Sequence, residues 1–430
     1  MQQHLTRSVL SNGLVVLSEH MPASPACSLS VWLRRGSASE HSGSGKSGEG
    51  ATSWPGGITH LLEHMVFKGT RRRTAREISL AIEGRGGQLN ASTGRSNTSF
   101  YCSALNEDWE LCLDLLADML LESVFDAREL EKEQGVILDE IRQVEESPDE
   151  LLYDLAFLDM YPASPWGPPV QGTEAEVQAV DRARLQRFAE ACRRGGELVV
   201  AFAGDLEHER LHRRCDELFG ALPAGRQLVP EAPPVAPGRS EHRRDFGRQA
   251  HLQLGRTGPD AANPQTPALS LLTLLLGDGM SSRLFQSLRE DLGLCYTVFS
   301  WQEGLGRGAA FGAYFACDAA RIDEVQAACL AEIGKLCLHG VTAEELEHAR
   351  QQMRGGWLIA QEQSMSRMVQ LAKGELRHGR LVPVSERLER LEAQSVESLG
   401  RAAREWLEPE GFHISRLLPE EEGEDDASPD

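Results

Sequence analysis

A proline-rich segment near the middle of the chain limits the folds that are open to it. Residues 222–238 read LPAGRQLVPEAPPVAPG, and closely spaced prolines favour an extended connector over a helix or a central strand. The chain has 430 residues, which is too long for one ordinary hydrophobic core. We therefore expect two domains of similar size, at residues 1–221 and 243–418, joined by a linker at residues 222–242.

Each half mixes strand and helix patterns in a similar order. The first half shows a strand pair at residues 88–93 and 98–104, followed by helical patterns at 106–122 and 126–144. The second half shows strands at 296–302 and 309–316, followed by helical patterns at 322–338 and from 342 onward. The segment DARELE at residue 126 also aligns with TAEELE at residue 342. These patterns predict an α+β fold of two homologous α/β sandwiches, each an antiparallel-rich sheet packed with helices.

Charge and hydropathy exclude several classes of protein. The formal net charge is −21, which argues against a nucleic-acid partner and favours basic peptides. Part of this charge lies in residues 419–430, which we expect to form an acidic, disordered tail. No apolar run approaches the roughly 20 residues that span a bilayer. We therefore expect no membrane span.

The cysteines point to a reducing compartment. All nine are scattered along the chain and none is spaced as CxxC, so neither a disulfide framework nor a cysteine-based zinc site is expected. The first residues, MQQHLTR, lack the apolar core of an export signal. We therefore expect a cytoplasmic protein.

The motif with the clearest chemical meaning is His60-Leu61-Leu62-Glu63-His64. On a helix, His60 and His64 project from the same face, where one zinc ion can take both imidazoles. Glu63 lies beside that face and is free to accept a proton from an attacking water molecule. This H-x-x-E-H order is the pattern of inverted zincins. The alternative is a chance match on a solvent-facing helix.

A catalytic zinc commonly takes three protein ligands, so a third ligand is expected elsewhere. The helical pattern at 126–144 offers Glu133 and Glu140, which are seven residues apart and therefore on one face. The same segment also carries other acidic residues, so both glutamates could instead be ordinary residues on an exposed, charged helix surface. Spacing alone does not choose among these carboxylates.

The chain resembles the pitrilysin/insulinase family, most closely the branch that includes mitochondrial processing peptidase and its bacterial relatives. The segment Val136-Ile137-Leu138-Asp139-Glu140-Ile141 resembles the family's distal metal-binding pattern. The resemblance implies Glu140 as the third zinc ligand and Glu133 as the residue that orients the site. It also implies one zinc ion per chain.

Further matches extend over nearly the whole chain. The segment that contains Asn90 and Ala91 resembles the strand on which a peptide substrate adds as an extra strand. Arg289 and Tyr296 resemble a pair that helps to hold the substrate. The resemblance further implies a homodimer or a heterodimer with a related subunit. Without it, ordinary surface packing would be the simpler interpretation of Arg289 and Tyr296.

The sequence also departs from the family pattern. Residues Ser42–Trp54 look like an insertion before the metal-binding helix. In the second copy, Ala349 and Gly356 stand where the first has Glu133 and Glu140. We therefore expect a catalytic first half and a second half that binds no metal but holds substrate.

The sequence thus predicts a zinc-dependent endopeptidase that cleaves unstructured or presequence-like peptides. Two alternatives remain: a scaffold or regulatory subunit of the same fold, and a zinc hydrolase that acts on other substrates.

Overall fold

The computed structural model describes residues 3–40, 53–225 and 231–420. The predicted insertion Ser42–Trp54 lies outside the described residues except for its last two positions. Of the predicted tail at 419–430, only the first two residues are described.

The first half contains a six-stranded sheet with the order β1-β2-β6-β3-β5-β4. Its strands are β1 His4–Val9, β2 Val15–His20, β3 Ala26–Leu33, β4 Gln88–Thr93, β5 Thr98–Leu105 and β6 Leu198–Gly204. All neighbours are antiparallel except β2 and β6, which run parallel. The predicted hairpin is confirmed as β4 and β5, with Gln88 opposite Ser103. Because β4 is the last strand, one of its edges carries no neighbouring strand of this sheet.

The second half contains a five-stranded sheet with the order β7-β11-β8-β10-β9. Its strands are β7 Gly238–Arg244, β8 Gln249–Gly258, β9 Cys295–Leu305, β10 Gly308–Asp318 and β11 His413–Pro419. Strand β7 begins inside the segment expected as a linker, so five of those residues pair with β11. The domain boundaries themselves stay a prediction.

The helices follow the strands in a similar order in both halves. Those of the first half are α1 Ile58–Met65, α2 Ala75–Glu83, α3 Trp109–Glu122, α4 Ala127–Glu146, α5 Pro148–Met160, α6 Glu174–Gln178, α7 Arg182–Cys192 and α8 His208–Phe219. Those of the second half are α9 Thr266–Gly277, α10 Ile322–His339, α11 Ala343–Ala360, α12 Ser364–His378, α13 Val384–Glu392 and α14 Val396–Trp406, with a π-helical segment, η5, at Phe285–Asp291. Helix α4 begins after Asp126, whose carboxylate accepts hydrogen bonds from the backbone of Arg128 and Glu129. Asp126 therefore caps the start of this helix.

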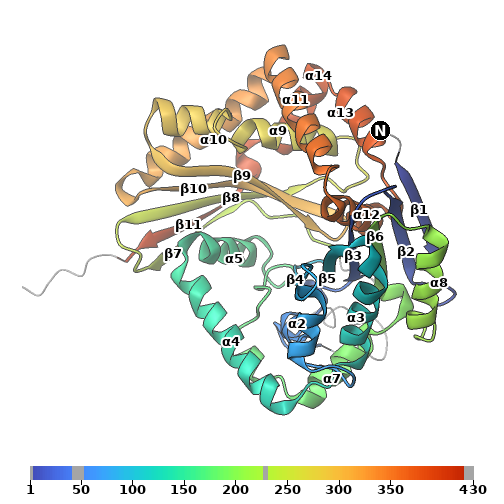
Figure 1. The fold of residues 1–430 in the computed structure, drawn as a ribbon. Helices are drawn as coiled ribbons and strands as arrows, with labels where there is room; N and C mark the ends of the chain where they lie inside the picture. The colour runs from blue at the N-terminus through green and yellow to red at the C-terminus, as the bar shows by residue number, and fades with distance from the viewer. Residues whose placement is uncertain (1–2, 41–52, 226–230, 421–430) are drawn as a thin grey trace, which may run out of the picture.

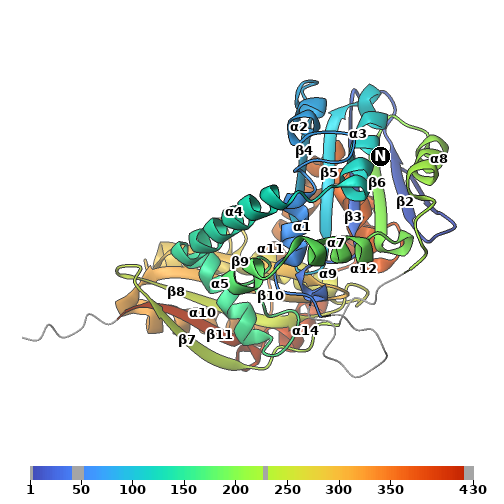
Figure 2. The same cartoon turned by 90° about the horizontal axis from the view of Figure 1, so that it is seen from below.

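Each half supplies one helix to the sheet of the other half (Figures 1 and 2). Helix α12, from the second half, packs on β2, β3 and β6, and its residues Met368 and Leu371 join the buried face around Trp32. Helix α5, from the first half, packs on β8 and β11, where Leu152 meets Leu417. The two halves consequently share their hydrophobic cores, and the protein is a two-domain α+β fold with interlocked domains.

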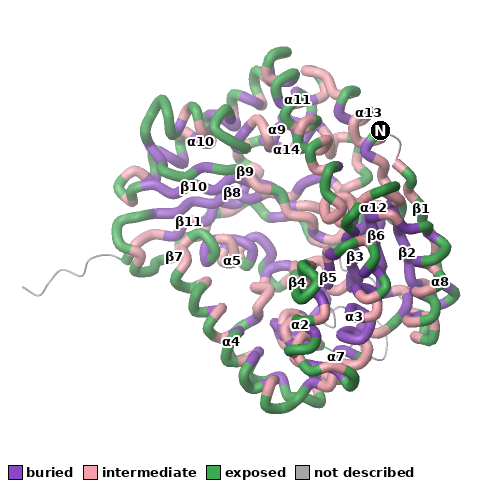
Figure 3. The backbone as a smooth tube through the Cα atoms, in the orientation of Figure 1, coloured by how far each residue is buried: buried purple, intermediate pink, exposed green. Residues whose placement is uncertain are grey.

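The core follows the central strands of both sheets (Figure 3). Every residue of β6 is buried, because this strand is covered on one side by α12 from the second half and on the other side by helices of the first half. Such continuous burial explains its run of apolar residues, LVVAFAG. In the described part of the chain, no helix is both long and apolar enough to cross a membrane.

Candidate active site

Helix α1 carries the H-x-x-E-H motif at the edge of the first core. Its residues Ile58, Leu61, Leu62 and Met65 are buried, so the opposite face must point away from the core. His60 and His64 lie on that face with their ring centroids 4.6 Å apart. The helical spacing predicted from the sequence therefore places both imidazoles side by side.

The start of α1 is held by the side-chain carboxyl group of a residue outside the helix. Gly57 stands at the N-cap with φ of 79°, and a Cβ there would clash with the carbonyl oxygen of Gln171. Glycine supplies no capping side chain. Instead, Glu40 accepts hydrogen bonds from the backbone N–H groups of Gly57 at 2.9 Å and Thr59 at 2.8 Å. Glu40 is fully buried.

Sequence reasoning missed Glu40. The only sequence signal was the pair of glycines at the start of a helix that lacks a local capping residue. That signal shows that a cap is needed, but it does not show which residue provides it.

Helix α4 brings Glu140 to the two histidines. The Oε2 atom of Glu140 lies 3.9 Å from Nε2 of His60 and 3.8 Å from Nε2 of His64. These separations exceed hydrogen-bond length, so the three groups converge without bonding to one another. Among the described residues, this is the one group of three or more potential ligands whose donor atoms lie within 4.8 Å of one another.

This donor set fits zinc. Two imidazole nitrogens and one carboxylate oxygen are the protein ligands of many catalytic zinc sites, and three ligands leave a coordination position open. Burial, followed by the neighbouring His64, lowers the pKa of His60 to about 4. His60 is therefore neutral at physiological pH, which is the form that binds metal.

Glu133 forms a hydrogen bond with the ring nitrogen of His64 that faces away from Glu140. Its side chain is buried, with an exposed fraction of 8%, and its Oε2 accepts a hydrogen bond from Nδ1 of His64 at 3.1 Å. Its other oxygen pairs with the ammonium group of Lys68 at 2.6 Å. The hydrogen bond from His64 to Glu133 keeps the proton of His64 on Nδ1. The lone pair of Nε2 then faces Glu140.

The environment of Glu63 suits a proton acceptor. Burial is the main cause that raises the pKa of its carboxyl group, and a hydrogen bond from the hydroxyl of Thr93 partly opposes this effect. Thr93 is the last residue of strand β4. The end of the edge strand and the H-x-x-E-H helix are thus joined at Glu63. A carboxylate with a raised pKa is better matched to proton transfer near neutral pH than an ordinary glutamate.

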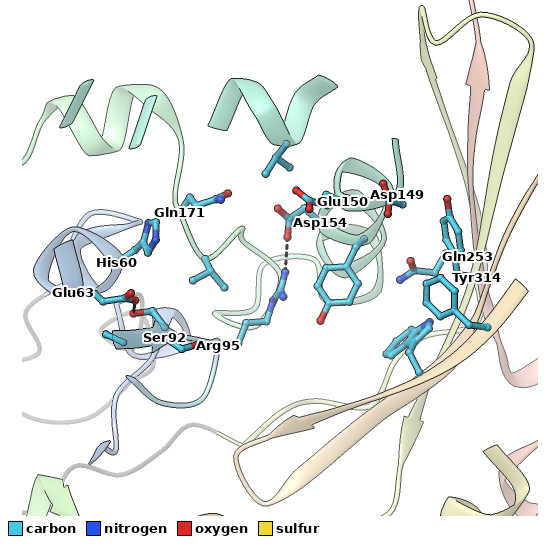
Figure 4. Close-up of a pocket in the computed structure, with 17 residues that line it drawn as sticks. His60, Glu63, Ser92, Arg95, Asp149, Glu150, Asp154, Gln171, Gln253 and Tyr314 are labelled. Atoms are coloured by element: carbon cyan, nitrogen blue, oxygen red, sulfur yellow. Dashed lines mark hydrogen bonds and ion pairs between the residues drawn. The ribbon is translucent and has the colours of Figure 1, made fainter. Parts of the chain in front are cut away.

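Both halves line a cavity beside this centre (Figure 4). The cavity has a volume of about 580 Å³. The first half contributes His60, Glu63 and residues 91–93, whereas the second half contributes aromatic and amide side chains. The latter are Gln253, Phe299, Trp301 and Tyr314.

Helix α5 and the β4–β5 turn supply the charges of the cavity wall. Asp149, Glu150 and Asp154 line it from α5. The guanidinium group of Arg95 donates to Asp154 at 3.0 Å and lies 4.0 Å from the ring centroid of Phe157. Asp154 is therefore neutralised within the protein, while Asp149 and Glu150 remain available to a ligand that carries positive charge.

The remaining residues predicted to bind substrate lie in different places. Ala91 lines the cavity. Asn90 is exposed on β4, and its side-chain oxygen accepts from the backbone N–H of Ala91 at 2.8 Å. Arg289 lies over the ring of Phe285, 4.7 Å from its centroid. Tyr296 is 63% exposed. The cavity wall, as far as the described residues define it, includes neither Arg289 nor Tyr296.

The sequence is similar to those of known peptidases. Residues 15–174 match the family model described as insulinase, peptidase family M16, and residues 179–353 match the one described as the peptidase M16 inactive domain. An uncharacterized zinc protease of Streptomyces coelicolor is 34% identical over 93% of this chain and 87% of its own length. The uncharacterized zinc protease YmxG of Bacillus subtilis is 30% identical over 96% of this chain and 98% of its own.

Solved structures show the same fold. A protease from Helicobacter pylori superimposes with a TM-score of 0.87 at 21% identity, covering 97% of this chain and all of the other. A structure from Pseudomonas fluorescens, described as a peptidase M16 inactive domain, gives a TM-score of 0.86 at 19% identity and covers 97% of this chain and 98% of its own. Together with the sequence matches, these findings show that the chain belongs to the insulinase family of peptidases, family M16.

Proposed function

We propose that this protein is a zinc-dependent endopeptidase that cleaves unstructured peptides. The observation that supports this most strongly is the convergence of His60, His64 and Glu140 beside the buried carboxyl group of Glu63. The first three residues would hold the metal. A zinc ion held by such ligands polarises a carbonyl group and lowers the pKa of a water molecule.

Glu63 then performs the proton transfers of hydrolysis. It accepts the proton of the attacking water molecule, and it returns this proton to the amine that leaves when the peptide bond breaks. Thr93 holds the carboxyl group of Glu63 in place through its hydroxyl. Glu133 keeps His64 in the tautomer that a metal ligand requires.

The shape and charge of the cavity support a peptide substrate. The edge of β4 next to Glu63 offers backbone groups with which an extended peptide can pair. The carboxylates of Asp149 and Glu150 favour basic side chains. Because the site lies between walls from both halves, a flexible peptide enters more readily than a folded protein.

The dimer and the substrate-holding role of Arg289 and Tyr296 remain proposals. Since neither residue lines the cavity of its own chain, a second chain or a rearrangement would have to bring them to the site. A cytoplasmic location is also part of the proposal. It is supported by the nine cysteines, all of which are free.

The test compares the purified wild type with Glu63→Gln on a quenched fluorescent, unstructured basic peptide, with zinc content measured for both. We expect the wild type to cleave the peptide and the variant to retain zinc while losing nearly all activity. Glu131→Gln, an exposed position on α4, serves as the control and should cleave normally. Equal cleavage by wild type and Glu63→Gln would refute the assignment of Glu63. Zinc binding without cleavage by either would favour a scaffold subunit.

A further inference from the structure

One wall of the active-site cavity comes from the second sheet and lies across from His60 and Glu63 (Figure 4). Three neighbouring strands build it: Gln253 on β8 is opposite Tyr314 on β10, and Tyr314 is opposite Phe299 on β9. Residues directly opposite one another point to the same face of a sheet. These three side chains therefore form one row that faces the cavity.

Gln253 is a buried polar residue in this wall. It is 2% exposed, and its Nε2 atom has no hydrogen-bond partner among the residues that the structure describes. Its neighbours Leu252 and Leu254 point into the second hydrophobic core, so Gln253 points to the opposite face, toward the cavity. A buried amide is normally hydrogen-bonded, and an unpaired one costs free energy. The stability of the fold therefore does not explain a glutamine at this position.

The adjacent polar groups do not supply the missing partner. The hydroxyl of Tyr314 lies 2.7 Å from Nδ1 of His251. The hydroxyl of Ser415, on the adjacent strand β11, accepts a hydrogen bond from Ser240 at 3.0 Å. The indole N–H of Trp301, in the same wall, is a second buried donor for which the described part of the chain offers no acceptor. Two unpaired donors beside one cavity suit a bound group that accepts hydrogen bonds.

The aromatic part of the wall is open to the cavity. Phe299 is 42% exposed, and its ring stacks on that of Tyr314 with centroids 4.9 Å apart and an interplanar angle of 29°. An exposed aromatic surface in a cavity wall is typical of a site that receives an apolar side chain. The wall thus combines an unpaired amide with an apolar surface.

The charge of the cavity decides which acceptor fits. An unpaired N–H also suits a carboxylate, but Asp149 and Glu150 line the same cavity, and like charges repel each other. A neutral peptide carbonyl avoids this repulsion. The amide of Gln253 has both a donor and an acceptor, and rotation about its last side-chain bond, which is only weakly restricted, presents either of them to a peptide group.

We propose that Gln253 binds a backbone peptide group of the substrate, and that Phe299, stacked on Tyr314, binds an apolar side chain of the same segment. This inference rests on the proposed function, because it adds a second contact to the peptide that is cleaved beside Glu63. It gives the second half a substrate-holding surface within its own chain. Peptides with an apolar residue at a fixed distance from the cleaved bond should then be preferred.

The test measures peptide binding to the zinc-loaded Glu63→Gln protein, so that it does not require cleavage. The probe is a fluorescein-labelled, unstructured basic peptide, and fluorescence anisotropy gives its Kd. Gln253→Met keeps the length of the side chain and removes both polar atoms. We expect it to weaken binding about 3- to 10-fold, as the loss of one neutral hydrogen bond does. Gln249→Met, exposed on the same strand, is the matched control and should bind normally.

Urea unfolding separates a binding role of Gln253 from a structural one. Since its Nε2 atom has no partner in the described part of the protein, Gln253→Met should be at least as stable as Gln249→Met. A lower stability of Gln253→Met would show that the amide is bonded within the fold, and would overturn the proposal.

Phe299 is tested by a double-mutant cycle between protein and peptide. A series of peptides carries one leucine at successive positions among serine and arginine residues. We expect one position at which the leucine improves binding to the parent protein but not to Phe299→Ser. Leu338→Ser, which changes an exposed leucine on α10, should keep the full preference.

The outcomes separate this inference from the proposed function. The inference is overturned if Gln253→Met binds as tightly as Gln249→Met, or if no leucine position depends on Phe299. Cleavage of the same peptides by the wild type is measured in parallel. Cleavage without these binding effects removes the subsite and leaves the proposed function intact. Binding that depends on Gln253 and Phe299, without cleavage, supports the subsite and contradicts the proposed hydrolysis.

Discussion

Glu133 and His64 are 69 positions apart in the sequence, yet an oxygen of Glu133 lies 3.1 Å from Nδ1 of His64. This contact determines which ring nitrogen of His64 keeps its proton. It therefore controls whether Nε2 presents a lone pair toward His60 and Glu140, the other two proposed metal ligands. Glu133 is itself held by Lys68 at 2.6 Å, so the orientation of the proposed metal ligand His64 also depends on Lys68.

Removing the acceptor behind His64 should weaken zinc binding. We expect Glu133→Ala to reduce zinc affinity about 10- to 100-fold, which is the usual effect of losing such a partner. Glu133→Gln keeps an acceptor oxygen and should therefore reduce zinc affinity less than Glu133→Ala does. Competition with a chromogenic chelator measures both. Glu131→Ala, exposed on the same helix, is the control; a loss of similar size in this variant would contradict the role of Glu133.

The buried carboxyl group of Glu40 should stabilise the metal-free protein through helix α1. Glu40→Ala leaves the N–H groups of Gly57 and Thr59 without their partner, and an unsatisfied buried group costs about 1–3 kcal/mol. Urea unfolding of the metal-free protein measures this loss. Glu40→Gln retains one good acceptor and should lie between Glu40→Ala and the wild type. If Glu40→Ala is no less stable than Glu190→Ala, an exposed control on α7, the capping role is wrong.

The exchanged helices should make each domain depend on the other. Leu371 belongs to the second half but is 5% exposed against the first sheet. Leu371→Ala should cost about 2–5 kcal/mol, and hydrogen exchange should accelerate in β2, β3 and β6. Leu152→Ala, the corresponding change on α5, should accelerate exchange in β8 and β11. Faster exchange confined to the half that carries each substitution would contradict the shared cores.

A buried histidine should make stability fall in mild acid. His251 is 4% exposed, and its Nδ1 lies 2.7 Å from the hydroxyl of Tyr314. Burial lowers its pKa, so below about pH 6.5 the unfolded chain binds a proton that the folded chain does not. The free energy of unfolding therefore decreases as the pH falls.

Urea unfolding at pH 7.5 and pH 5.5 tests this prediction. We expect His251→Gln to show a smaller difference in unfolding free energy between the two pH values than the wild type. His339→Gln, an exposed control, should keep the full difference. An unchanged difference in His251→Gln would show that this histidine does not contribute.

Local patterns predicted the elements that carry the site, within a few residues at their ends. The hairpin that became β4 and β5 follows from strand alternation, and the start of α4 follows from Asp126 as a capping residue. The H-x-x-E-H spacing placed His60 and His64 together, because a helix fixes the relation between residues four apart. The same kind of pattern could not choose between Glu133 and Glu140, which lie on one face. Only the resemblance to a family separated them before the structure was known.

The sequence by itself determined the α+β composition of both halves and the pair of histidines, because these depend on residues close together in the chain. The tertiary structure alone decided three other features: the cap that Glu40 provides for α1, the exchange of α5 and α12 between the sheets, and the position of Arg289 and Tyr296 outside the cavity. Each of these depends on contacts, or on the lack of contacts, between segments far apart in the chain. Local periodicity carries no information about such contacts, because it records only which face of an element is apolar and not which surface that face will meet.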